Sequence, residues 1–438
     1  MNRRDRQILQ IAVPAILSNI TVPLLGLADI AIVGHLGSAS YIGAIAVGGM
    51  AFNIVYWMFG FLRMGTSGIT SQALGRRDLS EAMHTLIRSM LIGWALALCL
   101  LLFQHPVREV IYRIIGPDEQ VLRLATAYYD IGIWGAPATL GIYSLTGWFI
   151  GMQNSRAPML MAVSQNLINI AVSLCLVFGL GMKVEGVAAG TVTAQYVGLL
   201  IGLGLWKHSY QRLRRHVVPS ALWQSARLKQ LFFVNRDIFL RTCCLVAVML
   251  SFTSIGARQG ELILAANTLL MQLYLLYSYV MDGFAFAGEA LAGKFIGAGN
   301  LSAFCETLRR LTRWAAAAAV AFTLAYFLLG NQILHLLTNE QEVVSTASAY
   351  LYAASLVALT GTAAFVLDGV FIGATATLDM LLSVFLSALL FFGLYFGLRP
   401  TLANHGLWVA YNSFLAFRGV VLYLRLNPLK KRHFGRSK

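Results

Sequence analysis

The sequence predicts an all-α, polytopic membrane protein with 12 transmembrane helices in two pseudo-symmetric six-helix bundles. Three observations predict this fold: an apolar composition, apolar segments of membrane-spanning length from end to end, and an internal repeat. Of the 438 residues, 58% are hydrophobic and only 12% are charged, whereas a typical soluble domain carries about 25% charged residues. A spanning helix needs about 20 apolar residues, and the alternating pattern of a transmembrane β-barrel is missing.

The first apolar segment follows a basic N-terminus but is too long for the hydrophobic region of a signal peptide, so we interpret it as an uncleaved transmembrane helix. Several of the expected helices exceed 25 residues and must tilt, kink or extend beyond the bilayer. Pro14, Pro23 and Pro137 are candidate kink sites. The twelve expected helices cover residues 7–34, 42–74, 84–112, 121–151, 157–181, 184–207, 231–255, 260–297, 304–337, 344–374, 378–398 and 404–426.

Lysine and arginine residues predict the orientation. Of the 33, 24 lie on the side of the termini and six on the opposite side, and three lie inside helices. Because positive charge accumulates in cytoplasmic segments, both termini are expected in the cytoplasm and the chain in the cell inner membrane. The longest polar interval, 208–230, is expected to be a basic cytoplasmic linker, and 427–438 a basic cytoplasmic tail. The net charge of +15 therefore indicates topology and anionic lipid, and we expect no nucleic-acid partner.

An internal repeat divides the chain into an N-lobe, 1–207, and a C-lobe, 231–426. GWFIGMQ at 147–153 recurs as GVFIGAT at 369–375, an offset of 222 that also relates ATAYY (125–129) to ASAYL (347–351) and GRRDLS (75–80) to GAGNLS (297–302). Six helices per half is an even number, so both halves enter the membrane from the same side and the repeat is parallel. Transporters place substrate at such repeat interfaces; a duplicated receptor or scaffold without a transport pathway is the remote alternative.

The resemblance to a known family rests on five runs of residues. PAILSNITVPLLGLADIAIVGHLG (14–37), FLRMGTSGITSQALGRRD (61–78), FVNRDIFLR (233–241), YVMDGFAFAGEA (279–290) and LDGVFIGAT (367–375) resemble the multidrug and toxic compound extrusion (MATE) family, specifically its DinF branch, in the MOP flippase superfamily. The resemblance covers nearly the whole chain. It implies two lobes that alternate between outward-open and inward-open states.

The resemblance also implies export of amphiphilic, often cationic small molecules in exchange for H⁺ or Na⁺. The leading hypothesis is therefore a proton-coupled multidrug antiporter that works by alternating access. A Na⁺-coupled exporter and a lipid-linked saccharide flippase of the same superfamily stay open as alternatives. A diphosphate-handling cavity would gather several arginines or lysines at depth, and only Arg63, Arg241 and Arg418 are available.

Enzymatic and cofactor chemistry finds little support in the sequence. No P-loop is present, and GTSG at 65–68 is not the GxSxG motif of a serine hydrolase. The five cysteines show neither disulfide spacing nor a CxxC metal pattern. We therefore expect no enzyme activity, no metal and no cofactor, an ion gradient as the energy source, membrane lipids as partners, and a monomer.

Asp29 is the principal candidate for cation coupling. It lies in the outer part of the first helix, six residues after Pro23, and has no cation nearby in sequence. An isolated carboxylate is costly in a bilayer, which favours a neutral, protonated form. Pro23 removes a backbone hydrogen bond, so the helix could kink differently when Asp29 is neutral. The family resemblance assigns the matching aspartate the cation-coupling role; a polar helix-packing residue is the alternative.

The helix at 157–181 supplies further polar residues, Asn166 and Asn169. Many relatives read N-x-x-x-D here, but this chain has Ser173 at the aspartate position. The difference weakens a relay of two carboxylates and weakens a Na⁺ site. We expect Asn169 and Gln195 to act with Asp29 in cation coupling. The polar shell around them is expected to comprise Asn19, Asn166, Ser173, Thr191 and Thr193.

Charged residues in the C-lobe form the second candidate set. Asp282 and Glu289 are seven residues apart, so they share a helix face. Arg241 matches the depth of Glu289 on a neighbouring antiparallel helix, which predicts a buried ion pair, with a substrate or coupling site as the alternative. Arg63 has an equivalent depth in the first half and could bridge the lobes. Asp368 stands alone on its helix.

Overall fold

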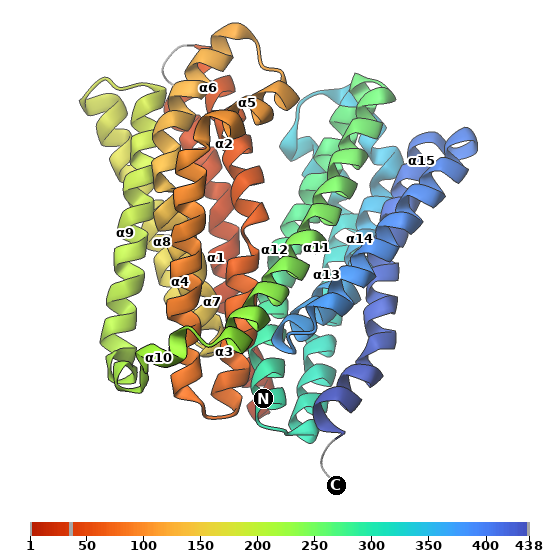
Figure 1. The fold of residues 1–438 in the computed structure, drawn as a ribbon. Coiled ribbons are helices and arrows are strands. Elements are labelled where there is room, and N and C mark those ends of the chain that lie inside the picture. Colours follow the sequence, from red (N-terminus) through yellow and green to blue (C-terminus); the bar gives the residue numbers. More distant parts are fainter. Residues whose placement is uncertain (1, 35–37, 436–438) are drawn as a thin grey trace. The chain divides into compact units, whose positions relative to one another are not determined.

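The computed structural model describes residues 2–34 and 38–435, and no strand occurs among them. Internal contacts group the chain into two compact units. We call Leu17–Leu231 the N-terminal unit, and Met1–Ile16 together with Phe232–Lys438 the C-terminal unit. The long helix α1 (Arg3–Gly34) contributes to both. Figure 1 shows each unit built from long helices that run side by side.

The N-terminal unit contains the remainder of α1 and nine further α-helices. Within it, α8 packs along α9, α3 along α7, and α2 along α6. A 3₁₀ turn, Ile133–Gly135, separates α6 from α7, and α8 ends in a short π-helix, Cys175–Gly179. The helices are α2 (Ala39–Met58), α3 (Phe61–Gly75), α4 (Leu79–Leu102), α5 (Gln104–Ile115), α6 (Glu119–Gly132), α7 (Ala136–Gly151), α8 (Arg156–Leu174), α9 (Val184–Tyr210) and α10 (Pro219–Leu222).

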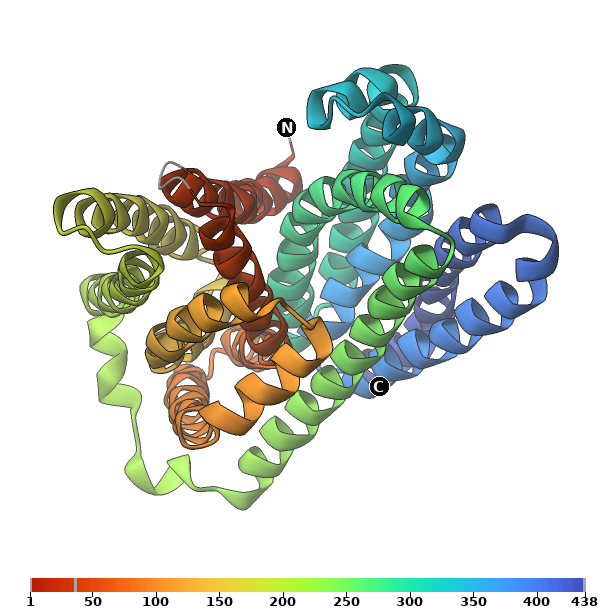
Figure 2. The same cartoon turned by 90° about the horizontal axis from the view of Figure 1, so that it is seen from above.

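Five further helices belong mainly to the C-terminal unit, although the first turns of α11, up to Leu231, lie in the N-terminal unit. They are α11 (Ser225–Arg258), α12 (Glu261–Gly297), α13 (Leu301–Leu337), α14 (Gln341–Gly373) and α15 (Thr377–Phe434). Helix α14 packs along α12, α13 and α15. Figures 1 and 2 show the two halves of α15, in blue, folded back beside one another. The break is at Ala403, which has a left-handed φ of 44°.

The membrane-spanning helices agree with the predicted fold class. Among the described residues, 11 helices are long and apolar enough to cross a membrane. The remaining expected span, 121–151, is divided by the 3₁₀ turn into α6 and α7. Pro137 lies in the first turn of α7, where its missing N–H has no helical partner to lose. Proline therefore marks a helix start here, and not a kink within one continuous helix.

Two other predicted spans are interrupted. The span 42–74 consists of α2 and α3, which are separated by Phe59 and Gly60. The span 84–112 consists of α4 and α5, which are separated at Phe103. The break at Phe59 and Gly60 lies within apolar sequence, so hydropathy alone could not locate it, whereas the break at Phe103 comes directly before the largely polar segment 104–109.

Glycine pairs in α7 and α14 give both units the same helix crossing. A Cβ atom on Gly147 would lie 2.2 Å from the carbonyl oxygen of Arg63, and one on Gly369 would lie 2.1 Å from that of Ala285. One turn later, Gly151 and Gly373 lie against the carbonyl oxygens of Ser67 and Glu289. Every partner in one unit is 222 residues from its counterpart in the other, so the sequence repeat is also a repeat of backbone contacts. Such small-xxx-small pairs allow close approach of membrane helices.

The helix ends repeat with the same offset. Asp78 accepts a hydrogen bond from the N–H of Glu81 at the start of α4, and Asn300 accepts one from Ala303 at the start of α13, both at 2.9 Å. The residues before these caps, Arg77 and Gly299, both have left-handed φ angles, 61° and 64°. An aspartate or asparagine cap satisfies N–H groups that the first turn leaves free.

The first half of α1 belongs with the C-terminal unit because it packs closely on α12. A Cβ atom on Gly283 would lie 2.8 Å from the carbonyl oxygen of Ala12 and 2.3 Å from Cγ1 of Ile16. Near its start, Asp5 accepts a 2.9 Å hydrogen bond from Arg310 on α13. The absence of a side chain at Gly283 is what lets the two helix backbones approach.

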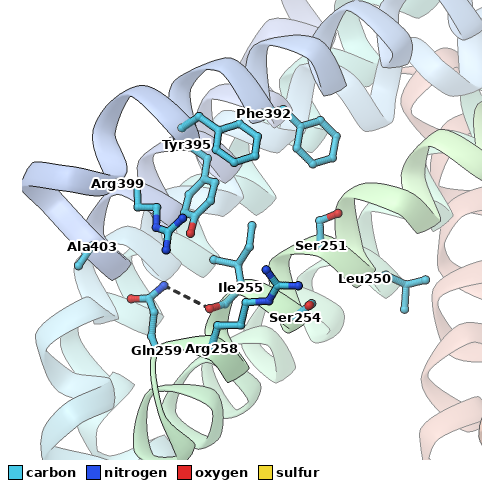
Figure 3. A pocket seen from close by; sticks show the side chains of 11 residues that line it. Leu250, Ser251, Ser254, Ile255, Arg258, Gln259, Phe392, Tyr395, Arg399 and Ala403 are labelled. Atoms are coloured by element: carbon cyan, nitrogen blue, oxygen red, sulfur yellow. Dashed lines mark hydrogen bonds between the residues drawn. The ribbon is translucent and has the colours of Figure 1, made fainter. Parts of the chain in front are cut away.

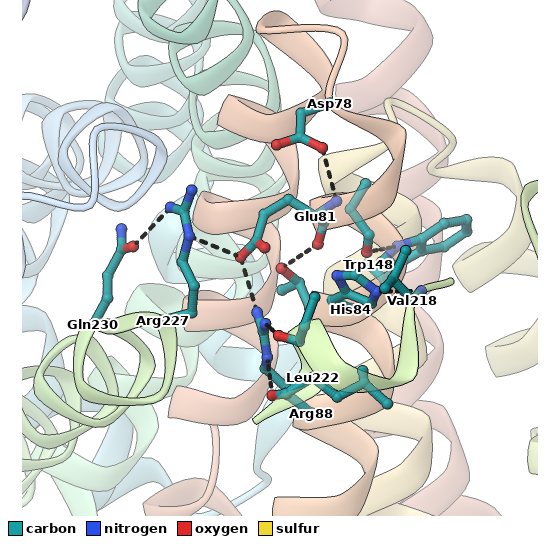
Figure 4. Close-up of polar contacts among 12 residues, drawn as sticks. Asp78, Glu81, His84, Arg88, Trp148, Val218, Leu222, Arg227 and Gln230 are labelled. Atoms are coloured by element: carbon teal, nitrogen blue, oxygen red, sulfur yellow. Dashed lines mark hydrogen bonds and ion pairs between the residues drawn. The ribbon is translucent and has the colours of Figure 1, made fainter. Parts of the chain in front are cut away.

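The polar linker is anchored on α4 by a buried cluster, shown in Figure 4. Arg88, 3% exposed, forms a 2.9 Å ion pair with Glu81. It also donates to the carbonyl oxygens of Ala221 at 2.6 Å and Leu222 at 2.8 Å. The ring nitrogen Nε2 of His84 accepts a hydrogen bond from the N–H of Val218. The linker, predicted from the sequence only as a basic segment, is therefore a structured part of the N-terminal unit.

Candidate functional site

Nine buried side-chain oxygens of the N-terminal unit have no hydrogen-bond partner among the described residues. Four of the nine belong to Asp29 (Oδ1), Asn169 (Oδ1), Ser173 (Oγ) and Gln195 (Oε1), and the other five to Tyr56, Ser67, Thr70, Tyr129 and Thr139. The first four residues were predicted from the sequence as coupling or polar-shell residues. Buried polar groups are normally hydrogen-bonded, so a group of unsatisfied acceptors calls for an explanation.

Hydrogen bonds connect this cluster across α8 and α9. The side-chain amide of Asn169 donates a 2.8 Å hydrogen bond to Thr191 Oγ1, which in turn donates to the carbonyl oxygen of Val187 at 3.0 Å. This arrangement uses the amide N–H of Asn169 and leaves its carbonyl oxygen free. The orientation of Asn169 is thus fixed by Thr191.

Tyr128 on α6 joins the cluster to α1. Its side chain is buried, and both Asp29 and Thr191 lie within electrostatic range of its hydroxyl. A Cβ atom on Gly48 would lie 2.3 Å from the Tyr128 ring, so α2 makes room for the tyrosine with a glycine. Four helices, α1, α6, α8 and α9, therefore supply the cluster.

Two more glycines bring the backbones around the cluster together. A Cβ atom on Gly190 would lie 2.2 Å from Ser173 Oγ, and one on Gly135 would lie 1.6 Å from Gln195 Oε1. Gly135 belongs to the 3₁₀ turn that interrupts α6 and α7. The turn thus provides the space that the Gln195 side chain occupies.

Of the other predicted shell residues, not all reach the cluster. Asn166 donates a 3.1 Å hydrogen bond to the carbonyl oxygen of Thr21 and so ties α8 to α1. Thr193 is exposed and donates to the carbonyl oxygen of Ala189, so it is not part of the buried cluster. Asn19 is half-buried on α1, and Pro23 is exposed within a helix that runs unbroken from Arg3 to Gly34.

The C-terminal unit contains a buried triad of charges formed by Arg241, Asp368 and Arg418. Both arginines donate to the same carboxylate oxygen, Asp368 Oδ2, and all three residues are at most 6% exposed. The expected ion pair between Arg241 and Glu289 was therefore wrong. The prediction compared only how deep the two residues lie along their helices and did not consider which helix face each side chain occupies. The carboxylate next to Arg241 comes from α14 and not from α12.

The comparisons with known proteins decide the family. The sequence model of the MatE family matches residues 14–175 and 238–396. The DNA damage-inducible protein F of Escherichia coli is 37% identical over 432 residues, covering 98% of this chain and 93% of that protein. The chain belongs to the MatE family. It is therefore a multi-pass membrane transporter of the multidrug and toxic compound extrusion class.

More distant MatE relatives and solved structures agree with this assignment. The chloroplastic Protein DETOXIFICATION 44 of Arabidopsis thaliana is 28% identical over 96% of this chain and 82% of that protein. A crystal structure of MATE in the bent conformation superposes with a TM-score of 0.89 at 18% identity, covering 99% of this chain and 97% of that one. The eukaryotic MATE transporter AtDTX14 superposes with a TM-score of 0.85 at 16% identity, over 100% and 99% of the two chains. These likenesses confirm the predicted MATE fold of 12 transmembrane helices.

The remaining predicted charged residues of this MatE transporter lie on α3 and α12. Glu289 is fully buried on α12, and its backbone carbonyl lies against Gly373. Asp282 is half-buried and lies close enough to Tyr274 and Tyr279 for its charge to act on both. Arg63 is half-buried on α3, near Tyr143. In the part of the chain that the structure describes, no three histidine, cysteine or acidic residues gather in a metal-binding group.

Two residues of this MatE transporter belong to the candidate sites although the sequence did not assign them there. In the sequence, Tyr128 was noted only as part of the repeated ATAYY segment (125–129). Its place in that repeat was the one signal that could have marked it as a candidate partner for Asp29. Arg418 was recognised as an arginine inside a helix, but no partner was assigned to it. Both gain their significance from contacts between helices that are distant in sequence.

Proposed function

We propose that this transporter exports amphiphilic, mainly cationic small molecules across the cell inner membrane in exchange for protons. The observation that carries the proposal is the set of buried oxygens without a partner among the described residues of the N-terminal unit, to which Asp29 contributes a carboxylate oxygen and Asn169, Ser173 and Gln195 contribute neutral ones. A single negative charge can be neutralised by a single proton. The drug-export part is supported by relatives such as the probable multidrug resistance protein NorM of Photorhabdus laumondii, which is 22% identical over 79% of this chain.

Protonation has a specific structural consequence in this cluster. A protonated carboxyl group is a hydrogen-bond donor, whereas a carboxylate only accepts. Two other atoms of this set, Asn169 Oδ1 and Gln195 Oε1, are acceptors. Protonated Asp29 could therefore satisfy an acceptor that the carboxylate cannot, and this would change how the outer part of α1 packs on α6, α8 and α9. We propose that this change opens or closes the N-terminal unit for drug.

Sodium coupling is the second candidate, and the same oxygens favour it. Hard cations prefer carboxylate, carbonyl and hydroxyl ligands, and the four free oxygens offer all three kinds. Against it, Ser173 supplies a neutral oxygen at the position where the family motif has a second carboxylate. A site with one carboxylate offsets the cost of dehydrating a Na⁺ ion less well than a site with two carboxylates.

A flux experiment separates the two cations. The purified protein is reconstituted in proteoliposomes, and transport of a fluorescent amphiphilic cation is measured under an imposed pH gradient or an imposed Na⁺ gradient. The proposal expects uptake driven by the pH gradient in the absence of Na⁺. Uptake that requires the Na⁺ gradient would replace protons by sodium, and no uptake under either gradient would contradict export of cations.

The orientation belongs to the same proposal. The excess of lysine and arginine supports a cytoplasmic location for both termini and the linker. A single cysteine at the exposed position Ser220, in a variant without the five native cysteines, tests this with a membrane-impermeant thiol reagent. We expect labelling only after the cells are opened; labelling of intact cells would reverse the orientation.

A further inference from the structure

A pocket of about 480 Å³ lies in the C-terminal unit, between the end of α11 and the break in α15. It is separate from the charge triad and from the cluster around Asp29. Figure 3 shows Arg258 and Arg399 projecting into the space between the two helices, together with Tyr395. Ala403, with its left-handed φ of 44°, also lines the pocket. The chain reversal at Ala403 thus keeps Arg399 close to the end of α11.

The two arginines lack compensation by protein groups. Both side chains are exposed, and among the described residues neither forms an ion pair or a side-chain hydrogen bond. The eleven residues that line the pocket include no acidic side chain. Arg258 and Arg399 are also two of only six basic residues on the side opposite to the termini. Because basic residues are depleted on that side, two that converge on one pocket require an explanation.

The pocket changes from polar to apolar along the helix axes. Arg258 ends α11, and Leu250, eight residues earlier, lies about 12 Å deeper at 1.5 Å per residue. On α15, Arg399 is at the end of its helical segment, and Phe392 lies about 10 Å deeper. Ser254 and Tyr395 line the interval between these levels. A ligand that fits this gradient has an anionic head and an apolar tail.

We propose that this pocket binds an anionic phospholipid, with the phosphodiester at Arg258 and Arg399 and an acyl chain along Leu250 and Phe392. Arginine forms paired, charge-assisted hydrogen bonds with phosphate oxygens. The lipid comes from the leaflet that this end of the unit meets, which is the outer leaflet in the predicted topology. It holds the end of α11 to the reversal of α15, so it acts as a structural ligand of the C-terminal unit.

Binding of short-chain phosphatidylglycerol to the full-length protein in a neutral detergent tests the proposal. Isothermal titration and thermal unfolding are both measured, with short-chain phosphatidylcholine and inorganic phosphate as comparison ligands. We expect phosphatidylglycerol to bind and to raise the unfolding temperature, and the two comparison ligands to bind at least about tenfold more weakly. Equal binding of inorganic phosphate would overturn the lipid assignment, and equal binding of phosphatidylcholine would overturn the role of the anionic head.

Two variants and one control locate the site. Arg258→Gln with Arg399→Gln removes the head contacts, and Ser254→Trp fills the pocket while keeping both arginines. We expect each to weaken phosphatidylglycerol binding about tenfold or more, because charge-assisted hydrogen bonds or tail contacts are lost. The control, Arg113→Gln with Arg123→Gln, removes two exposed arginines on the same predicted side of the N-terminal unit. An equal loss in the control, or unchanged binding in both pocket variants, would overturn the proposal. Unfolding temperatures without lipid verify that each variant is folded.

Discussion

The amide of Asn169 donates a 2.8 Å hydrogen bond to the hydroxyl of Thr191, and this bond determines which atom Asn169 offers to the Asp29 cluster. With its N–H groups directed at Thr191, Asn169 presents its carbonyl oxygen as a free acceptor. We propose that Thr191 influences Asp29 through the orientation of Asn169.

The first prediction tests this positioning role. Thr191→Val removes the acceptor for Asn169 and leaves a side chain of similar shape. We expect drug export to fall several-fold and its dependence on external pH to shift, while the unfolding temperature changes little. Thr193→Val is the matched control, because Thr193 is two residues away, exposed, and bonded only to the carbonyl oxygen of Ala189. If drug export depended on pH in the same way in both variants, Thr191 would have no positioning role in coupling.

The second prediction concerns the buried triad. Removing one partner of a buried ion pair costs about 3–5 kcal/mol, so Arg241→Met and Asp368→Leu should each unfold at lower temperature. Because these residues contact each other, the double variant should lose less stability than the sum of the two single effects. Arg241→Met combined with Glu289→Gln, the pair that depth alone had suggested, should be additive. The readout is thermal unfolding in detergent. Additivity for Arg241 with Asp368 would reject the triad.

The third prediction uses the repeated glycines. A methyl group on Gly147 or Gly369 would approach a backbone carbonyl oxygen to within 2.2 or 2.1 Å, and overpacking of this kind typically costs about 1–3 kcal/mol. Gly147→Ala and Gly369→Ala should therefore lower the stability of the folded protein by similar amounts. Gly49→Ala is the control, since nothing lies within 4 Å of its Cβ position, and alanine in a helix should leave stability equal or slightly higher. Unchanged melting of the two variants would contradict the shared helix crossing.

The fourth prediction concerns the anchored linker. Arg88→Gln breaks the contacts with Glu81 and with the carbonyl oxygens of Ala221 and Leu222. We expect limited trypsin digestion to cleave the linker several-fold faster than in the parent protein. Arg227→Gln is the control, because Arg227 is more exposed and lies 3.9 Å from Glu81. Equal cleavage rates in Arg88→Gln and the parent would show that the linker is held by other contacts.

Much of the fold follows from one-dimensional patterns in the sequence. Apolar length predicted the spanning helices, and the offset of 222 residues predicted a duplication that the glycine contacts at Gly147 and Gly369 repeat in the backbone. The breaks at Phe59 and Ile133 were not predictable from hydropathy, because they interrupt apolar segments without changing composition. These breaks matter for the site, since the turn before α7 provides the space for Gln195.

The candidate site was predictable only in part. The sequence singled out Asp29, Asn169, Ser173 and Gln195 because each is polar in an apolar helix. In the described part of the chain, each has a buried oxygen without a hydrogen-bond partner. The partner of Arg241 could not be predicted, because helical depth gives no information about which face of α12 or α14 turns toward α11. Tyr128 was missed for the same reason: a tyrosine in a membrane helix is common, and only the fold brings it to Asp29.

Drug transport by Asp29→Asn tests the central claim most directly. Asparagine keeps the shape of the side chain but can neither take up nor release a proton. In proteoliposomes we expect the variant to bind the fluorescent cation with no pH dependence between about pH 5 and 8. Burial can bring the pKa of a carboxyl group into this range. Its transport driven by a pH gradient should fall to background. A normally folded Asp29→Asn protein that transports at the parental rate under the same gradient would contradict proton coupling through Asp29.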